Sequence, residues 1–125
     1  MNYDIISSEK APKAVGTYSQ GVDLGELILY SGQIGISPET GEMASDFEGQ
    51  MTQILKNIDG LLEHSNLTRR NICKTTVFLK DLSQFDIVNQ HYVKYFETPY
   101  PARSCVEVSR LPKDALVEIE VIAIK

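Results

Sequence analysis

The segment Leu116–Ile124 constrains the fold more than any other part of the chain, because it is apolar at almost every position. β-Branched residues dominate it, which predicts a strand whose side chains alternate between the two faces of a sheet. One face carries four apolar side chains and the other carries three: Val117, Ile119, Val121 and Ala123 against Leu116, Ile122 and Ile124. The sheet that contains this strand must therefore be covered on both sides.

Two amphipathic helices supply cover for one side. The first follows a stripe of apolar residues at helical spacing: Phe47, Met51, Ile54, Leu55, Ile58, Leu61 and Leu62. Ser45 and Glu48 are spaced as a capping box at its start. The second begins at Ser83, which we expect to cap it, and stops before Pro99 and Pro101. Its apolar face consists of Phe85, Val88, Tyr92 and Phe96. Since the helices cover one side only, we expect a second copy of the chain to cover the other.

The remaining apolar segments predict the other strands. Ile5-Ile6 begins the first, Leu27 begins a second that runs towards Ile36, Ile72–Leu79 forms a third and Ala102–Val108 a fourth. The order strand, strand, helix, strand, helix, strand, strand is typical of an α+β fold, with two helices on one face of a mixed or mostly antiparallel sheet. We expect a single domain over residues 1–125.

Charge and cysteine content disfavour several classes of protein. The chain has 17 acidic and 12 basic residues, a formal net charge of −5, whereas nucleic-acid backbones attract basic surfaces. No stretch approaches the roughly 20 apolar residues that a membrane span requires. Cys73 and Cys105 form no CxxC pair, so neither a zinc site nor a redox motif is predicted. We expect a cytoplasmic protein that binds no metal, nucleic acid or membrane.

Charged residues in the last two predicted strands form the candidate site. If these strands pair as a hairpin closed around residues 109–114, Cys105 falls opposite Glu118. Arg103 then lies beside Glu118 and Glu120, on the face that the helices leave uncovered. Charges in an apolar strand are costly to bury, so they need either partners or a purpose.

Two interpretations of these charges are open at this point. One is a structural ion pair at a subunit interface. The other is a catalytic site, in which the planar fork of Arg103 holds a substrate carboxylate and Glu118 or Glu120 accepts a proton from water. Burial would raise the pKa of such a glutamate and the arginine would lower it.

A longer pattern extends around these residues. Near the C-terminus it comprises Pro101–Val108, Arg110–Ala115 and Val117–Glu120. Elsewhere it comprises Ala11-Pro12, Tyr18–Gly21, Ser31–Ile34, Lys74–Phe78 and Asn89. Together these segments closely resemble the signature of the RidA (YjgF) family of enamine/imine deaminases, over essentially the whole chain. Thr17 and Gly35 differ from the family pattern, in which proline is usual at both positions.

The resemblance implies a chorismate-mutase-like fold assembled as a homotrimer, with three sites in clefts between subunits. It also implies a hydrolytic reaction without metal or organic cofactor. The implied substrates are 2-aminoacrylate, 2-aminocrotonate and their 2-imino acid tautomers, which pyridoxal-phosphate enzymes such as threonine or serine dehydratase release. The products would be 2-keto acids and ammonia.

The same likeness implies a role for each candidate residue. Arg103 would bind the substrate carboxylate, and Glu118 rather than Glu120 would handle the attacking water. The backbone around Gly32 and Cys105 would contact the substrate. Three further side chains would line the cleft: Tyr18, Ser31 and Asn89. Such a site works mainly by positioning and electrostatics, because an imine carbon is already electrophilic.

Alternatives concern both the thiols and the class of function. Cys105 as a nucleophile would need a base, and neither His64 nor His91 has an obvious route to it, so a packed or cleft-lining thiol is favoured. Cys73 is expected in the core. The rival function is a non-catalytic ligand-binding or regulatory trimer, or a ribonuclease or translation inhibitor, activities to which the family has been linked. Loss of Glu118 would separate an enzyme from a binder, because only an enzyme would lose turnover.

Overall fold

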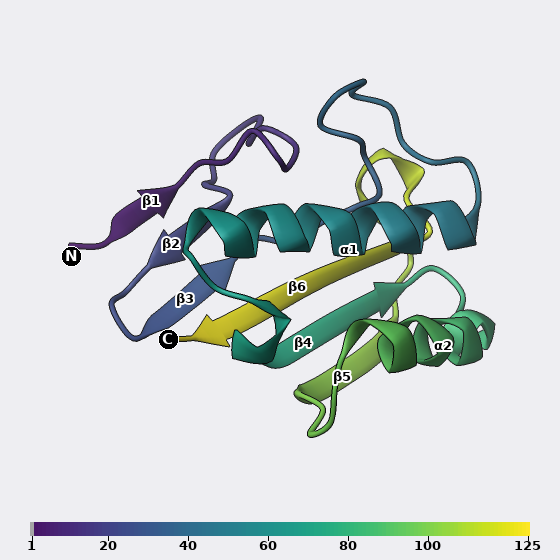
Figure 1. Cartoon of the computed structure of the whole chain (residues 1–125). Helices are drawn as coiled ribbons and strands as arrows, with labels where there is room; N and C mark the ends of the chain where they lie inside the picture. The colour runs from purple at the N-terminus through teal and green to yellow at the C-terminus, as the bar shows by residue number, and fades with distance from the viewer. Residues whose placement is uncertain (1) are drawn as a thin grey trace.

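The apolar strand predicted near the C-terminus is β6 (Val117–Ile124), and it lies inside the sheet rather than at its edge. The computed structural model describes residues 2–125. In this range six strands form one sheet in the order β1-β2-β3-β6-β4-β5, and two helices lie on one face of it (Figure 1). The other strands are β1 (Asp4–Ile6), β2 (Gly21–Asp23), β3 (Leu27–Tyr30), β4 (Ile72–Leu79) and β5 (Ala102–Glu107). The helices are α1 (Phe47–His64) and α2 (Phe85–Tyr95), and the short 3₁₀ turns are η1 (Arg69–Asn71), η2 (Leu82–Gln84) and η3 (Pro112–Asp114).

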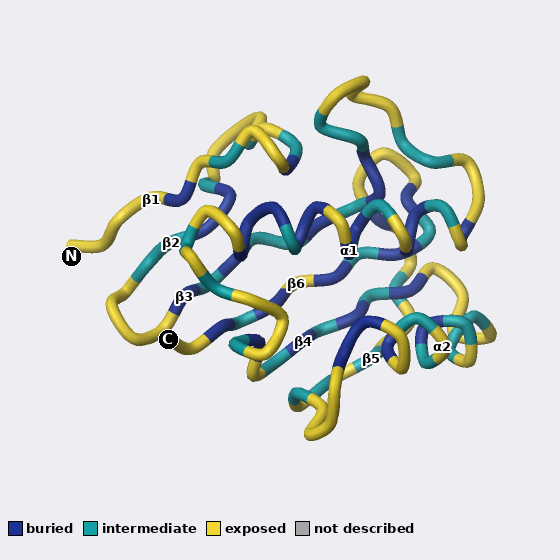
Figure 2. Tube along the Cα trace, viewed as in Figure 1, coloured by how far each residue is buried: buried dark blue, intermediate teal, exposed yellow. Residues whose placement is uncertain are grey.

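The core lies between the helices and the sheet. The four β6 side chains on this side are at most 2% exposed: Val117, Ile119, Val121 and Ala123. The apolar stripe of α1 is buried against them, and Figure 2 shows buried segments running along both α1 and β6. Because β4 pairs in parallel with β5 and all other neighbours pair antiparallel, the sheet is mixed. The predicted α+β architecture is therefore confirmed.

The opposite face of the sheet is less well covered. On β6, Ile122 is half-buried and Ile124 is 48% exposed. Val106 on β5 is 44% exposed, and Leu27 on β3 is 37% exposed. Neither α1 nor α2 lies on this side, so the open face fits the prediction that its cover comes from outside the chain.

The predicted hairpin of the last two strands is wrong. β5 pairs with β4 only, and β4 separates it from β6. β4 and β6 are the longest strands, at eight residues each, and placing both in the interior buries the most apolar side chains. β5, which carries Arg103 and Glu107, takes the edge, where charged side chains keep access to water.

This order changes which residues share a face. Arg103 pairs with Thr75, and Thr75 pairs with Val121, which is buried beneath the helices. Directly paired side chains point to the same side of a sheet. Glu118 alternates with the buried Val117 and Ile119, so it points to the open face and away from the side of Arg103. Arg103 and Glu118 therefore do not gather on one face within the chain.

The ends of several elements also differ from expectation. Asp46, not Ser45, caps α1, because its Oδ1 accepts a hydrogen bond of 2.8 Å from the Gly49 N–H. Asp81 rather than Ser83 provides the side-chain cap before α2, and it caps the η2 turn. β2 was not predicted at all, because its three residues, Gly21–Asp23, contain Val22 as their only large apolar side chain.

Two further predictions are wrong for local reasons. The strand beginning at Leu27 ends at Tyr30, and only Gln33 rejoins the sheet beyond it, through a single bridge to Ile119. Cys73 is exposed rather than buried, because an irregularity between Ile72 and Lys74 interrupts the alternation of β4.

The buried side-chain amide of Gln50 in α1 connects the segment after β3 to the rest of the fold. The Gln50 side chain donates to the Ala44 carbonyl at 2.9 Å and accepts from the Leu116 N–H at 2.8 Å. Gly35 faces this residue, and a Cβ at position 35 would lie 2.6 Å from the Gln50 Cα. In this chain the Cβ of a proline, which is usual here in the RidA pattern, would meet the Gln50 backbone. None of the helices within residues 2–125 is long and apolar enough to cross a bilayer.

Candidate functional site

Four of the predicted site residues line one pocket of about 680 Å³: Tyr18, Ser31, Gly32 and Glu118. We call these four residues the glutamate group. The N-terminal loop, the segment after β3 and the η3 turn form the walls. Much of the remaining lining is apolar, including Pro12, Val15, Ile34, Ile36 and Pro38. Such a pocket suits a small ligand with a carbon skeleton and few polar groups.

Gly32 allows the Glu118 side chain to lie against the backbone. A Cβ at position 32 would lie 3.0 Å from Glu118 Cδ and closer still to Oε1. The neighbouring Gln33 fixes this approach, because it exchanges backbone hydrogen bonds of 2.8 and 3.0 Å with Ile119. The predicted close approach at Gly32 is therefore made to the Glu118 side chain.

Ser31 and Gln20 hold the N-terminal loop over this pocket. The Ser31 hydroxyl donates to the Ser19 carbonyl at 2.6 Å, and the Ser31 N–H donates to the Gln20 carbonyl at 2.9 Å. The buried Gln20 amide donates to the Pro12 carbonyl at 2.7 Å and accepts from the Ser8 N–H at 2.6 Å. Tyr18 projects from the loop and is 52% exposed.

The environment of Glu118 favours its protonated form. Burial is the main cause that raises its pKa above the ordinary value, and the neighbouring Glu120 carboxylate raises it further. Arg103 contributes nothing to this shift, since it lies on the other side of the sheet. A carboxyl group with a raised pKa exchanges protons more readily near neutral pH.

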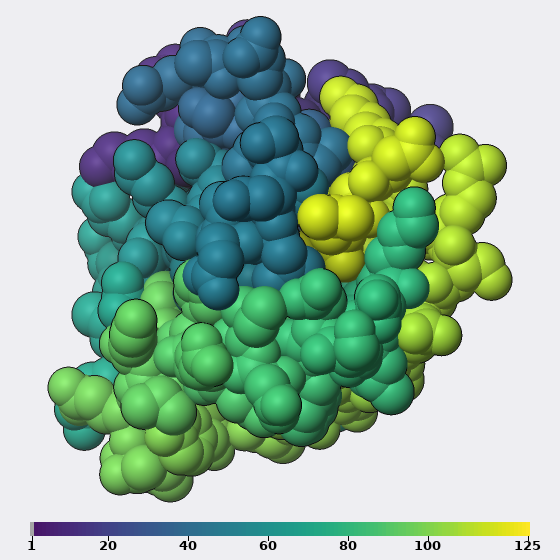
Figure 3. All heavy atoms as spheres, turned by 90° about the vertical axis from the view of Figure 1, so that its right-hand side faces the viewer, coloured from purple at the N-terminus to yellow at the C-terminus, as the bar shows by residue number. Residues whose placement is uncertain are grey.

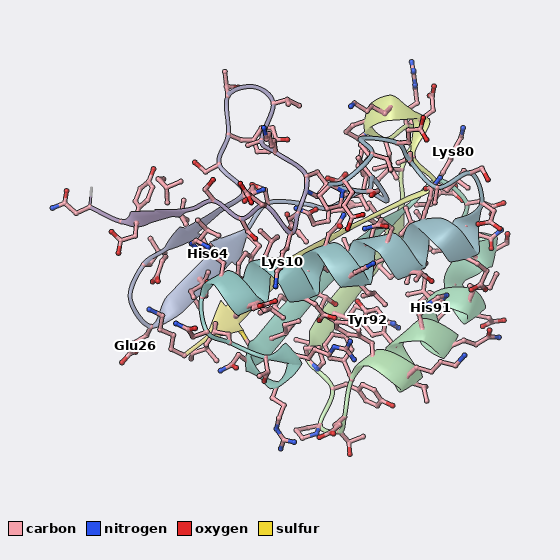
Figure 4. The ribbon with its side chains drawn as sticks, turned by 45° about the horizontal axis from the view of Figure 1, so that its top comes forward. Lys10, Glu26, His64, Lys80, His91 and Tyr92 are labelled. Carbon is pink, nitrogen blue, oxygen red and sulfur yellow. The ribbon has the colours of Figure 1, made fainter. Side chains whose placement is uncertain are left out.

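The other three predicted residues gather between β5 and α2, and we call them the arginine group: Asn89, Arg103 and Cys105. Arg103 Nη1 donates to Asn89 Oδ1 at 2.8 Å. Its guanidinium carbon lies 5.0 Å from the centre of the Phe85 ring and 4.9 Å from that of Tyr92. Tyr92 lies on α2 (Figure 4). The arginine group thus places a guanidinium, fixed by contacts to α2, on the edge strand β5.

Cys105 is a poor nucleophile in this setting. Burial raises the pKa of its thiol, and the nearby Arg103 only partly offsets that effect. His91, also labelled in Figure 4, is engaged elsewhere, with Nε2 lying 2.7 Å from Glu48 Oε2 at the start of α1. Figure 3 shows the start of α1 packed against α2. A protonated, half-buried thiol fits the packed or cleft-lining interpretation.

Several residues that surround these two groups were not predicted as site residues. Lys13, Gln33 and Lys113 line the pocket of Glu118. Gln33 lies within the family pattern at Ser31–Ile34 and adjoins Gly32, and these are the sequence signals that point to it. Phe85 and Tyr92 were predicted only as the apolar face of a helix, and no periodicity distinguishes an aromatic that packs from one that contacts a cation. Within residues 2–125, no three His, Cys, Asp or Glu side chains gather as metal ligands would.

Comparison with known proteins gives a consistent result. The profile of the family described as Endoribonuclease L-PSP matches residues 8–125. The 2-iminobutanoate/2-iminopropanoate deaminase of Escherichia coli K12 is 50% identical over 96% of both chains. The crystal structure of RidA from an Antarctic Psychrobacter species has a TM-score of 0.95 at 42% identity, over 98% of this chain and 99% of that one. E. coli TdcF with bound serine has a TM-score of 0.91 at 43% identity, over 98% of both chains. The chain therefore belongs to the Endoribonuclease L-PSP family, which includes the RidA (YjgF) deaminases that its sequence resembles.

Proposed function

We propose that this protein hydrolyses 2-imino acids and their enamine tautomers to 2-keto acids and ammonia, without a metal or organic cofactor. The observation that carries the proposal is the 50% identity, along nearly the whole chain, to a 2-iminobutanoate/2-iminopropanoate deaminase. The pocket around Glu118 is large enough to admit substrates of three or four carbons, and its lining is mainly apolar. The two free thiols, Cys73 and Cys105, fit a reducing compartment such as the cytoplasm.

We also propose that the working site forms between copies of the chain in a homotrimer. The glutamate group and the arginine group lie on opposite sides of the sheet, so one chain alone does not surround a substrate with both. The arginine group lies at an edge strand, where a neighbouring copy has access to it. The incompletely covered face of the sheet supplies apolar surface for such an assembly.

In this site Arg103 would hold the substrate carboxylate and Glu118 would direct water. An enamine first becomes its imine tautomer when its β-carbon (C3) gains a proton and its nitrogen loses one. Water then adds to the imine carbon while the Glu118 carboxylate accepts one of its protons. That proton passes to the nitrogen and gives a carbinolamine. The hydroxyl proton is then transferred to the nitrogen as the carbonyl forms, so that the C–N bond breaks and ammonia leaves. One imine and one water thus give one keto acid and one ammonia.

The relative with bound serine supports this class of substrate. Serine carries a carboxylate next to a carbon that bears nitrogen, as every 2-imino acid does. A site in the same fold, at 43% identity, therefore accommodates that arrangement of groups in TdcF. Arg103 is suited to the carboxylate because its fork donates hydrogen bonds to two oxygens at once.

A coupled assay tests the proposal. A dehydratase generates 2-aminoacrylate in the cuvette, and the appearance of pyruvate is followed with and without this protein. We expect clear acceleration over buffer, a loss of about 10²- to 10⁴-fold in turnover for Glu118→Gln with ligand affinity retained, and loss of substrate binding for Arg103→Ala. No acceleration by the natural protein, or full activity of Arg103→Ala, would refute the proposal.

The description of the family names an endoribonuclease, so RNA cleavage is the second candidate. The net charge of −5 argues against it, because an RNA backbone repels an acidic surface. The same protein preparation should be assayed on RNA before and after further purification. Cleavage that persists at constant specific activity and disappears in Arg103→Ala would favour this candidate over the deaminase.

A further inference from the structure

We propose that α2 acts as an arginine holder: Phe85, Asn89 and Tyr92 fix the guanidinium of Arg103 so that its free N–H groups form a ready carboxylate-binding fork. The inference rests on the proposed function in one respect, namely that Arg103 binds a carboxylate. It goes beyond that function by assigning three positioning residues, of which Phe85 and Tyr92 had no expected role besides packing.

The spacing of the three residues places them on one side of α2. They stand at positions i, i+4 and i+7, which share a helix face. This face lies against β5, and each of the three residues contacts the Arg103 guanidinium. An arginine side chain is long and flexible, so two aromatic contacts and a hydrogen bond remove much of its freedom before any ligand arrives.

Tyr92 is itself held in place. Its hydroxyl donates to Thr75 Oγ1 at 2.7 Å, and both residues are buried. Thr75 is the β4 residue paired directly with Arg103. The hydrogen bond to Thr75 therefore fixes Tyr92 beside the arginine that its ring contacts. The ring of Phe96 packs against Tyr92 at 5.1 Å between centres. Burial raises the pKa of Tyr92 to about 12, so its hydroxyl stays a neutral donor at physiological pH.

The hydrogen-bonding capacity of Arg103 is consistent with this arrangement. A guanidinium has five N–H donors, and Nη1 donates to Asn89. Bidentate binding of a carboxylate needs two parallel donors, which the remaining N–H groups supply. Since the fork is already oriented, a ligand loses less side-chain entropy on binding it. Removing the contacts of the arginine holder should therefore lower the affinity for carboxylates and leave the affinity for neutral ligands unchanged.

The test compares two ligands that differ only in this group, 2-oxobutanoate and its neutral analogue 2-oxobutanamide. Their affinities for the assembled protein are measured by calorimetry in natural protein, Phe85→Leu, Phe85→Tyr and Asn89→Ala. We expect Phe85→Leu and Asn89→Ala each to weaken 2-oxobutanoate by about 5- to 30-fold and to change 2-oxobutanamide by less than about twofold. Phe85→Tyr keeps the ring and should bind both ligands as the natural protein does.

Phe47→Leu serves as the matched control, since Phe47 is a buried phenylalanine at the start of α1, whereas the contacts to the Arg103 guanidinium come from α2. It should lower the melting temperature without changing the ratio of the two affinities. The holder is refuted if Phe85→Leu and Asn89→Ala leave 2-oxobutanoate binding intact, or if they weaken both ligands equally. A separate result, unchanged 2-oxobutanoate binding in Arg103→Ala, would instead refute the role of Arg103 in the proposed function.

Discussion

At the scale of single residues, the contact between Gly32 and Glu118 sets the position of the proposed catalytic carboxylate. Glycine is needed here for space, since a side chain at position 32 would occupy the place of the Glu118 carboxylate. The backbone bridge between Gln33 and Ile119 prevents the segment from moving aside. The position of the Glu118 carboxylate therefore depends on the absence of a side chain at Gly32.

Replacing Gly32 with alanine should displace the Glu118 carboxylate and reduce kcat by about 10²-fold, because misplacement of a catalytic group by about 1 Å has effects of that size. The coupled keto-acid assay measures this directly. Gly25→Ala is the control: it lies in the β2–β3 turn at a φ of 109°, where no heavy atom beyond its two chain neighbours lies within 4 Å of the added Cβ. It should strain the backbone and leave kcat unchanged, so an equal loss in both variants would contradict the prediction.

Glu120 should tune the pH dependence of the reaction. The carboxylate form of Glu118 accepts the proton, so activity falls as the pH drops through its pKa, which burial and then Glu120 raise above the ordinary value for a glutamate. Neutralising Glu120 removes one cause of the increase, and the acid limb of kcat/KM in Glu120→Gln should move to lower pH. Glu26→Gln, in the β2–β3 turn, should not move it. An unmoved limb in Glu120→Gln would show that the two carboxylates are not coupled.

At the scale of elements, α1 is the support for the site, and its start is fixed by Asp46. The helix begins beside the loop that carries Ala44, and its buried Gln50 connects that loop to the residue before β6. The pocket is thus built on a helix whose first turn must be well formed. Of the two adjacent polar residues Ser45 and Asp46, only Asp46 accepts the hydrogen bond that caps this turn.

Asp46→Ala should lower the free energy of unfolding by about 1 kcal/mol, because it removes the hydrogen bond to the Gly49 N–H. Ser45→Ala should change it by less than about 0.5 kcal/mol, as is usual for a surface substitution. Urea unfolding at one fixed protein concentration compares the two variants. If Ser45→Ala proves the more damaging, the capping box expected from the sequence forms in solution.

At the scale of the whole molecule, the glutamate group and the arginine group face opposite sides of one sheet. This placement has a functional meaning only if copies of the chain assemble so that one supplies Glu118 and the next supplies Arg103. Each subunit would then contribute to two different sites. A mixture of two inactive variants can reveal such an arrangement.

Glu118→Gln and Arg103→Ala should each be inactive alone. Equal amounts of the two variants are unfolded and refolded together to form mixed trimers. These should regain about one quarter of the natural activity, because the subunits assemble at random around a symmetric ring. A quarter of the interfaces would combine an intact Glu118 from one subunit with an intact Arg103 from its neighbour. Mixing without subunit exchange is the control. Absence of recovery in proven mixed trimers would contradict a shared site.

The sequence by itself determined the helices and most strands, the buried face of β6 and the family, because periodicity and motifs are local properties. It also identified Arg103 and Glu118 as residues of interest. Only the tertiary structure decided that β4 lies between β5 and β6, since strand order depends on which pairing buries the most apolar surface across the whole chain. That order places Arg103 under α2 and Glu118 on the open face. A strand order that no local pattern encodes thus changes an expected pair into two separate groups.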